Sequence, residues 1–304
     1  MVRDPVTHIK RVLGCMDVSE SSGGHRLVRA VLDIMKSHVH RCTEIYIEVS
    51  YGSSLPTVSR DLYGISTHLR KLSLICDYDN GPPKTLESMG EPRRIQALAR
   101  LEEIHLYGYT IFDAVEHNME LFSRSIKLEQ LEFGKFEVRF YDEAHIQSIL
   151  PAFFTALSFP RTQADYKLSW MKLPPLKPGP RAYTVSSSEL VLECLECDTV
   201  RLLMEHLDLE EKTILTLDRS SVDDVKICQP GPLILRDVEG DLVLPLYNWY
   251  GDDLDVQALM ITSSAPWERR AFLRSQSICV TLFLSAVYAI WLEGGCTTAA
   301  YGIQ

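Results

Sequence analysis

The chain repeats a short pattern of apolar positions: an aliphatic residue, two intervening residues, a second aliphatic residue, one more residue, and a third. The clear copies are Leu69/Leu72/Leu74, Leu101/Ile104/Leu106 and Leu128/Leu131/Phe133. Weaker copies are Cys42/Ile45/Ile47 and Val256/Leu259/Ile261, with the pairs Leu168/Trp170, Leu190/Leu192, Leu215/Leu217 and Leu233/Leu235. Because 46% of the residues are apolar, one copy arises readily by chance. The spacing between copies therefore carries the information.

The second apolar position recurs along most of the chain, at intervals of 18 to 37 residues. Its members are Ile45, Leu72, Ile104, Leu131, Leu168, Leu190, Leu215, Leu233 and Leu259. Most intervals fall near the period of about 20–29 residues that is typical of leucine-rich repeats. The interval from Leu131 to Leu168 is too long for one plain repeat. The pattern predicts one strand per repeat, with its apolar residues pointing inward.

Segments with helical spacing of apolar residues separate these strands. They are residues 112–125, residues 142–159 with an interruption or kink at Pro151, and residues 197–209. Alternation of strands and helices predicts parallel strands joined by crossovers. Residues 171–188 contain four prolines, which predicts a loop.

We therefore expect an α/β fold: an irregular leucine-rich-repeat solenoid with a curved parallel sheet on its concave side and helices or loops on its convex side. The predicted parts are an N-terminal helical cap or linker at 1–40, the repeat domain at 41–265, and a C-terminal apolar helix and tail at 266–304. The whole chain has only three asparagines, so no asparagine ladder closes the repeats. Backbone pairing or helices must close them instead.

The residues between the apolar positions are predicted to form a concave, protein-binding surface. They include Glu44, Tyr46, Glu48, Ser73, His105, Tyr107, Glu132, Ser169 and Thr216. The net charge of −10 argues against a nucleic-acid partner and favours a basic protein partner.

Cysteine usage and the chain's start bear on its location. The eight cysteines are scattered and no apolar signal segment precedes them, which predicts reduced thiols and a cytoplasmic or nuclear protein. Residues 275–292 carry no charge, but the run is short for a membrane span, so a core or capping helix is favoured over a tail anchor.

No complete catalytic constellation emerges, and we expect a protein without enzymatic activity or cofactor. The run Asp142-Glu143-Ala144-His145 matches a helicase motif, but the phosphate-binding loop that this chemistry requires is missing. We read the run as an acidic helix start. Cys194 and Cys197 have the spacing of a redox pair or half a zinc site, which leaves a redox or zinc-dependent function as an alternative.

Residues 38–77 resemble the fungal F-box/leucine-rich-repeat-like proteins. The residues that carry the resemblance are Arg41, Cys42 and Ile45, then Ser54-Leu55-Pro56, then His68 to Leu74. The resemblance extends over roughly residues 5–265 and implies the substrate-recognition part of a ubiquitin-ligase receptor. No L-P-x-E/D start of an F-box is found. A Skp-type adaptor is therefore expected as a partner only if an F-box lies upstream, and a truncated, non-functional receptor copy is a further alternative.

Overall fold

The computed structural model describes much of the chain, with gaps at the ends and in several connections. The described residues are 26, 28–34, 42–62, 68–83, 91–94, 100–125, 127–159, 163–175, 183–222, 231–238, 259–263 and 285–286. Residues 26 and 28–34 are helical, with Val28 and Leu32 buried at helical spacing. The remainder of the predicted cap at 1–40 lies outside the described residues.

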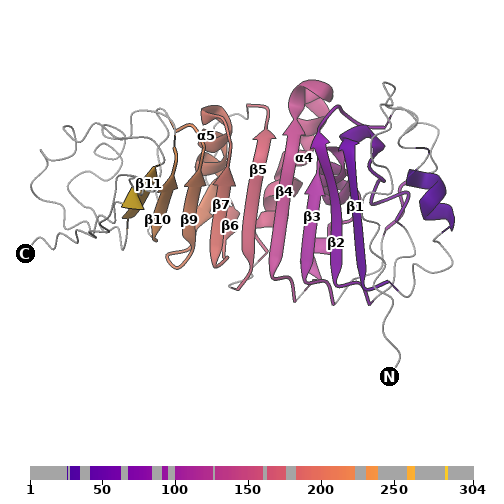
Figure 1. Cartoon of the computed structure of the whole chain (residues 1–304), viewed down its shortest axis with the longest axis horizontal. Coiled ribbons are helices and arrows are strands. Elements are labelled where there is room, and N and C mark those ends of the chain that lie inside the picture. Colours follow the sequence, from indigo (N-terminus) through magenta and orange to yellow (C-terminus); the bar gives the residue numbers. More distant parts are fainter. Residues whose placement is uncertain are drawn as a thin grey trace, which may run out of the picture.

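A large parallel sheet organises the described chain, and its strands follow one another in chain order (Figure 1). The strands are β1 (Glu44–Tyr51), β2 (Lys71–Tyr78), β3 (Glu103–Tyr107), β4 (Gln130–Glu137), β5 (Asp165–Lys172), β7 (Glu189–Glu193), β9 (Ile214–Asp218), β10 (Leu233–Arg236), β11 (Leu259–Ser263) and β12 (Ser285–Ala286). A second, two-stranded parallel sheet joins β6 (Tyr183–Val185) to β8 (Leu207–Leu209). The predicted α/β class with a parallel sheet is confirmed.

Short helices connect the strands. They are η1 (Gly52–Ser54), α2 (Tyr109–His117), α3 (Glu120–Ser123), η3 (Val138–Phe140), α4 (Glu143–Leu157) and α5 (Cys197–His206). In Figure 1, α4 and α5 lie behind the sheet, on the face where the apolar side chains are buried. The helical crossovers thus cover one face of the sheet.

The strands pair in phase, so equivalent residues lie side by side across the sheet. The second apolar position forms one continuous row: Ile45, Leu72, Ile104, Leu131, Tyr166, Leu190, Leu215, Leu233 and Leu259. Leu168 was wrongly predicted for this row. It pairs with Phe133 in the next inward row, while Tyr166 faces Leu131 and Trp170 is 49% exposed. The phenol of Tyr166 fills an inward position that the search for aliphatic residues missed.

Aromatic side chains fill the space between the helices and strand β4. Phe112 of α2 packs against Phe136 with ring centroids 4.4 Å apart, and Phe153 of α4 lies 5.5 Å from Phe133. These rings are fully buried, and each contributes roughly 2–3 kcal/mol by leaving water. The apolar faces of α2 and α4 are thereby fixed over the centre of the sheet.

The three predicted helical segments contain helices, but the segment at 197–209 is wrong at its end, because α5 stops at His206 and Leu207–Leu209 form β8. Residues 112–125 form two helices, α2 and α3, separated at Asn118. Helix α4 runs through Pro151, and Asp142 caps it by accepting a hydrogen bond from the Ala144 amide at 3.1 Å. The Asp142–His145 run is therefore a helix start, as predicted.

Of two other predicted segments, one differs from the prediction and one lies largely outside the described residues. The predicted loop at 171–188 is wrong at both ends, because Met171 and Lys172 complete β5 and Tyr183–Val185 form β6. Of the uncharged run at 275–292, only Ser285–Ala286 is described, as β12. None of the helices in the described part of the chain has the length and apolar character that crossing a bilayer requires.

Six successive strands of the large sheet carry a residue with positive φ (the left-handed backbone conformation), directly after β3, β7, β9 and β10 and two residues before the end of β4 and of β5. These residues are Gly108, Lys135, Trp170, Cys194, Arg219 and Asp237, with φ between 46° and 57°. Each lies at the same height, one residue beyond the row that contains Tyr107, Gly134, Ser169, Glu193, Asp218 and Arg236. This conformation costs about 1 kcal/mol in a residue other than glycine.

The left-handed residues turn the chain while keeping it hydrogen-bonded to the next strand. Gly108 donates its amide proton to the Gly134 carbonyl at 3.0 Å, and Cys194 donates to the Asp218 carbonyl at 2.8 Å. Ser220, three residues beyond Leu217, adds a side-chain link: its hydroxyl accepts from the Leu195 amide and donates to the Leu192 carbonyl, both at 3.0 Å. Backbone and side-chain hydrogen bonds together thus link these neighbouring turns.

Asp79 joins the turns that follow the first four sheet strands. Its carboxylate accepts hydrogen bonds from the amides of Gly81 and Glu137 and from the Tyr141 hydroxyl, at 2.7–3.1 Å. Gly52 and Gly108 make room for it, since a Cβ at either would lie 3.0–3.1 Å from an Asp79 oxygen. Burial raises the pKa of Asp79 above its ordinary value, although these hydrogen bonds favour the charged form.

Replacing Asp79 with asparagine removes this titration. Because the folded pKa of Asp79 is raised, its contribution to stability is fully present below its ordinary pKa of 3.8 and is lost as pH rises through the folded value. The free energy of unfolding of the wild type, relative to Asp79→Asn, should therefore fall as the pH rises from about 4 toward neutral. Urea unfolding across this range measures the difference. The exposed Asp77→Asn variant is the control, and parallel wild-type and Asp79→Asn curves would contradict the prediction.

Candidate functional site

Residues between the inward positions project from the sheet face that no described helix covers. We call this the open face; one register row across it contains Tyr46, Ser73, His105, Glu132, Lys167, Val191 and Thr216. The predicted residues Glu44, Glu48, Tyr107 and Ser169 lie on the same face in neighbouring rows. The nine predicted residues therefore do share one face.

Accessibility divides the predicted residues into two groups. Glu44, Tyr46, Glu48, His105, Tyr107 and Glu132 are partly exposed. Ser73, Ser169 and Thr216 are buried, so they support their neighbours and cannot themselves touch a large partner. Lys167 takes the central place on β5 that the sequence assigned to Ser169, because the register of that strand was misjudged by two residues.

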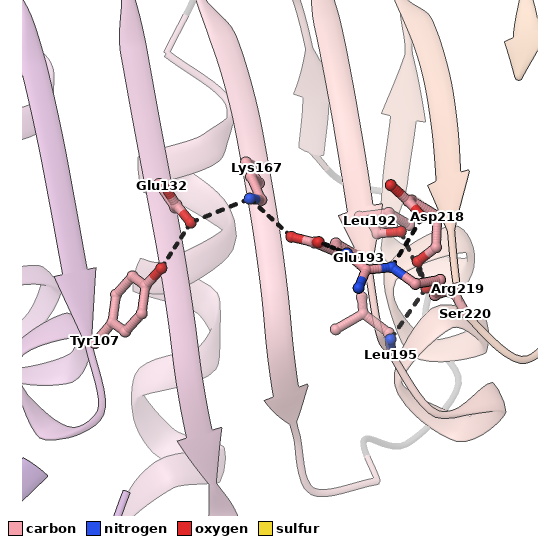
Figure 2. A network of polar contacts seen from close by, with 9 residues as sticks. All are labelled: Tyr107, Glu132, Lys167, Leu192, Glu193, Leu195, Asp218, Arg219 and Ser220. Atoms are coloured by element: carbon pink, nitrogen blue, oxygen red, sulfur yellow. Dashed lines mark hydrogen bonds and ion pairs between the residues drawn. The ribbon is translucent and has the colours of Figure 1, made fainter. Parts of the chain in front are cut away.

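A continuous polar network crosses the centre of the open face (Figure 2). Tyr107 donates its hydroxyl proton to Glu132 at 2.8 Å, and Lys167 lies between Glu132 at 3.5 Å and Glu193 at 2.7 Å. Arg219 continues the chain by pairing with Glu193 and Asp218. Five consecutive strands of the sheet are thus linked by side chains as well as by the backbone.

Tyr107 reaches this network by lying across Gly134. A Cβ at Gly134 would sit 2.9 Å from two ring carbons of Tyr107 and 2.8 Å from the Ser169 hydroxyl. Glycine is required here for the close approach of a side chain, since Gly134 itself is not among the residues with positive φ. Burial, followed by the charge of Glu132, raises the pKa of Tyr107, so its hydroxyl remains protonated as a donor.

Burial and neighbouring carboxylates shift the pKa values of His105 and Lys167. Burial lowers the pKa of His105 below its ordinary value of 6.5, so the ring is mainly neutral at pH 7, and its Nδ1 lies 3.3 Å from the Ser73 hydroxyl. Burial also lowers the pKa of Lys167, but Glu193 and Glu132 outweigh it and raise the pKa overall. Near neutral pH, His105 is therefore mainly uncharged and Lys167 is charged.

Cys194 and Cys197 lie where a redox pair would lie, at the end of β7 and the start of α5. Burial raises the pKa of the Cys194 thiol, which opposes the thiolate form that redox chemistry uses. Cys197 accepts a hydrogen bond from Arg201 at 3.3 Å. Within the described ranges, no three His, Cys, Asp or Glu side chains are grouped to hold a metal ion. The placement of the two cysteines fits the redox alternative, whereas the raised pKa of Cys194 opposes it.

Alanine at position 134 should displace Tyr107. We expect Gly134→Ala to cost about 1–3 kcal/mol of unfolding free energy, because the new methyl group overlaps the ring. In a Tyr107→Ala background the same substitution should cost about 1 kcal/mol less, since the overlap is gone. A double-mutant cycle by urea unfolding measures this coupling. Equal costs in the two backgrounds would show that the ring does not depend on Gly134.

Lys167 and Lys172 provide a matched test of the network. Lys167→Met leaves Glu132, which is 18% exposed, without its cation and leaves Glu193, which is 14% exposed, with Arg219 alone. Lys172→Met releases only Glu196, which is 64% exposed. We expect Lys167→Met to cost about 1–2 kcal/mol and Lys172→Met less than about 0.5 kcal/mol. Chemical unfolding at low salt compares the two variants. A cost for Lys172→Met that matched or exceeded that for Lys167→Met would refute the assignment.

Comparisons of the chain with protein-family models, curated proteins and solved structures found no match in any of the three. The conclusions about function below therefore rest on the residues and geometry of this chain alone.

Proposed function

We propose that the protein is a non-enzymatic binding module that holds a protein target on the open face of its sheet. The observation that carries the proposal is the in-phase row of side chains from Tyr46 to Thr216, on a face that no described helix covers. Stacked strands in chain order form an extended surface, which suits recognition of a large partner better than enclosure of a small substrate.

The finer architecture belongs to the same proposal. An irregular, curved leucine-rich-repeat solenoid, with the open face on its concave side, agrees with the chain order of the strands and with the shared height of their apolar anchors. By its resemblance to F-box/leucine-rich-repeat-like proteins, the target would be a substrate of a ubiquitin ligase. The ligase role additionally requires a Skp-type adaptor bound through an F-box.

The open face has the composition of a recognition surface as well as its shape. Tyr46 and Tyr107 present half-buried aromatic rings beside carboxylates, and tyrosine is enriched where interfaces concentrate their binding energy. The network of Tyr107, Glu132 and Lys167 holds these groups in place before a partner arrives. Such preorganisation reduces the entropy lost on binding.

Replacing Tyr46, His105 and Tyr107 together with alanine should abolish capture of a specific partner. Affinity purification followed by quantitative mass spectrometry, with wild type and variant compared side by side, measures the loss. The control is a triple alanine variant at Glu143, His145 and Gln147 on the exposed side of α4, which should retain the partner. Because Tyr107 also contributes packing, Tyr46→Ala alone should be tested as the milder variant, and circular dichroism should confirm folding. Partners captured equally by the open-face and control variants would refute the proposal.

A further inference from the structure

Charges on the open face are unequally compensated. From β1 to β7, the cations at outward strand positions are Lys71, Lys135, Lys167 and Lys172. Lys71 is paired with Glu103, Lys167 with Glu132 and Glu193, and Lys172 with Glu196, while the Lys135 amine lies 4.1 Å from the centre of the Trp170 ring. Other outward carboxylates form no ion pair with any residue in the described ranges; these are Glu44, Glu48, Asp77, Asp165 and Glu189. His105 adds little positive charge at pH 7, because burial lowers its pKa. The face is therefore strongly negative beyond its own network.

Two of these carboxylates oppose each other directly. Asp165 of β5 pairs in register with Glu189 of β7, on the same side of the sheet. Each accepts one hydroxyl hydrogen bond, from Ser188 and from Thr216 respectively, but neither has a cation among the described residues. Like charges directly opposite on adjacent strands are destabilising. A positive group placed between Asp165 and Glu189 would relieve their repulsion, which no described cation neutralises.

The N-terminal end of the face offers a second acceptor for a cation. Glu48 lies opposite Ile75 in the register of β1 and β2, with Tyr46 and Asp77 at neighbouring outward positions. Ile75 is partly exposed, and the Tyr46 hydroxyl donates to Glu48 at 2.8 Å. An apolar and aromatic floor beside carboxylates suits lysine or arginine, whose alkyl stem packs while the charged head is paired.

We infer that the partner of the open face presents a basic, extended segment that crosses the strands from Glu48 toward Asp165 and Glu189. This rests on the proposed function, because it states the chemistry of the partner for the same surface. From β1 to β5 the path crosses four strand spacings, about 19 Å, and shifts four residues along the strands, about 13 Å, so roughly seven extended residues span it. The net charge of −10 attracts such a segment and repels a nucleic-acid backbone.

The first experiment uses a fluorescein-labelled peptide of about twelve alternating arginine and serine residues, with a glutamate–serine peptide as its counterpart. Fluorescence anisotropy at low salt should show binding of the arginine peptide alone. Asp165→Asn with Glu189→Gln should weaken this binding about five-fold. Glu48→Gln with Asp77→Asn should weaken it similarly, and this second pair keeps the test valid if the first variant fails to fold.

The matched control is Glu205→Gln with Asp208→Asn, which removes the same net charge from exposed positions on α5 and β8. It should change the affinity less than about two-fold. Equal weakening of peptide binding by the control and the open-face variants would show that only the net charge of the protein matters, and would overturn the inference. Absence of arginine-peptide binding at low salt would also overturn it. An independent readout is stability: Asp165→Asn with Glu189→Gln should raise the urea midpoint of the free protein, because it removes the repulsion.

The inference and the proposed function fail in different ways. If a captured partner is lost from the Tyr46, His105 and Tyr107 variant but binds independently of salt and of Asp165 and Glu189, the binding role stands and the basic segment is refuted. A second outcome is capture of the partner that is independent of those three residues, while the arginine peptide still distinguishes the open-face variants from the control. In that case the proposed partner site is refuted, and the acidic site for a basic segment remains.

Discussion

In-phase pairing of parallel strands is the constraint on which the rest of this molecule depends. In the large sheet, every strand from β1 to β11 places one residue in the same register row, from Ile45 to Leu259. A shift of one residue in any strand would turn its apolar side chains to the open face and its polar ones into the core. The buried aromatic layer under α2 and α4, and the polar network above, both exist because this register is kept.

The register is kept by the way each strand ends. A residue with positive φ stands at a common height at or near the end of each strand from β3 to β10 of the large sheet, and the amides of Gly108, Cys194 and Arg219 bond the next strand. Glycine would adopt this conformation without strain, yet five of the six described positions hold Lys135, Trp170, Cys194, Arg219 and Asp237. Surrounding contacts must offset the strain at each, for example the Lys135 amine 4.1 Å from the centre of the Trp170 ring. At the first strands, the buried carboxylate of Asp79 links the turns by accepting hydrogen bonds from Gly81, Glu137 and Tyr141.

At the centre of the open face the charged side chains are paired with one another, whereas several carboxylates around this centre have no ion pair with a described residue. Lys167 neutralises Glu132 and Glu193, so the centre is rigid and its charges are already matched. Asp165, Glu189, Glu48 and Asp77 surround this centre without cations among the described residues. A partner would therefore gain more from pairing with the surrounding carboxylates than from breaking the network. The proposed binding module and its basic partner segment both follow from this distribution.

The sequence by itself determined the α/β class, the parallel strands and all but one of the anchor positions, because burial of one face imposes a periodic apolar pattern that survives without coordinates. It missed Tyr166 because a buried aromatic residue broke the aliphatic pattern, and it therefore placed Ser169 where Lys167 stands. Only the tertiary structure decided which outward residues are accessible, since Ser73, Ser169 and Thr216 are covered by side chains from adjacent strands. It alone also brought Tyr107 onto Gly134 and Asp165 opposite Glu189, because contacts between residues about 25 positions apart follow from strand register and leave no local signal in the chain.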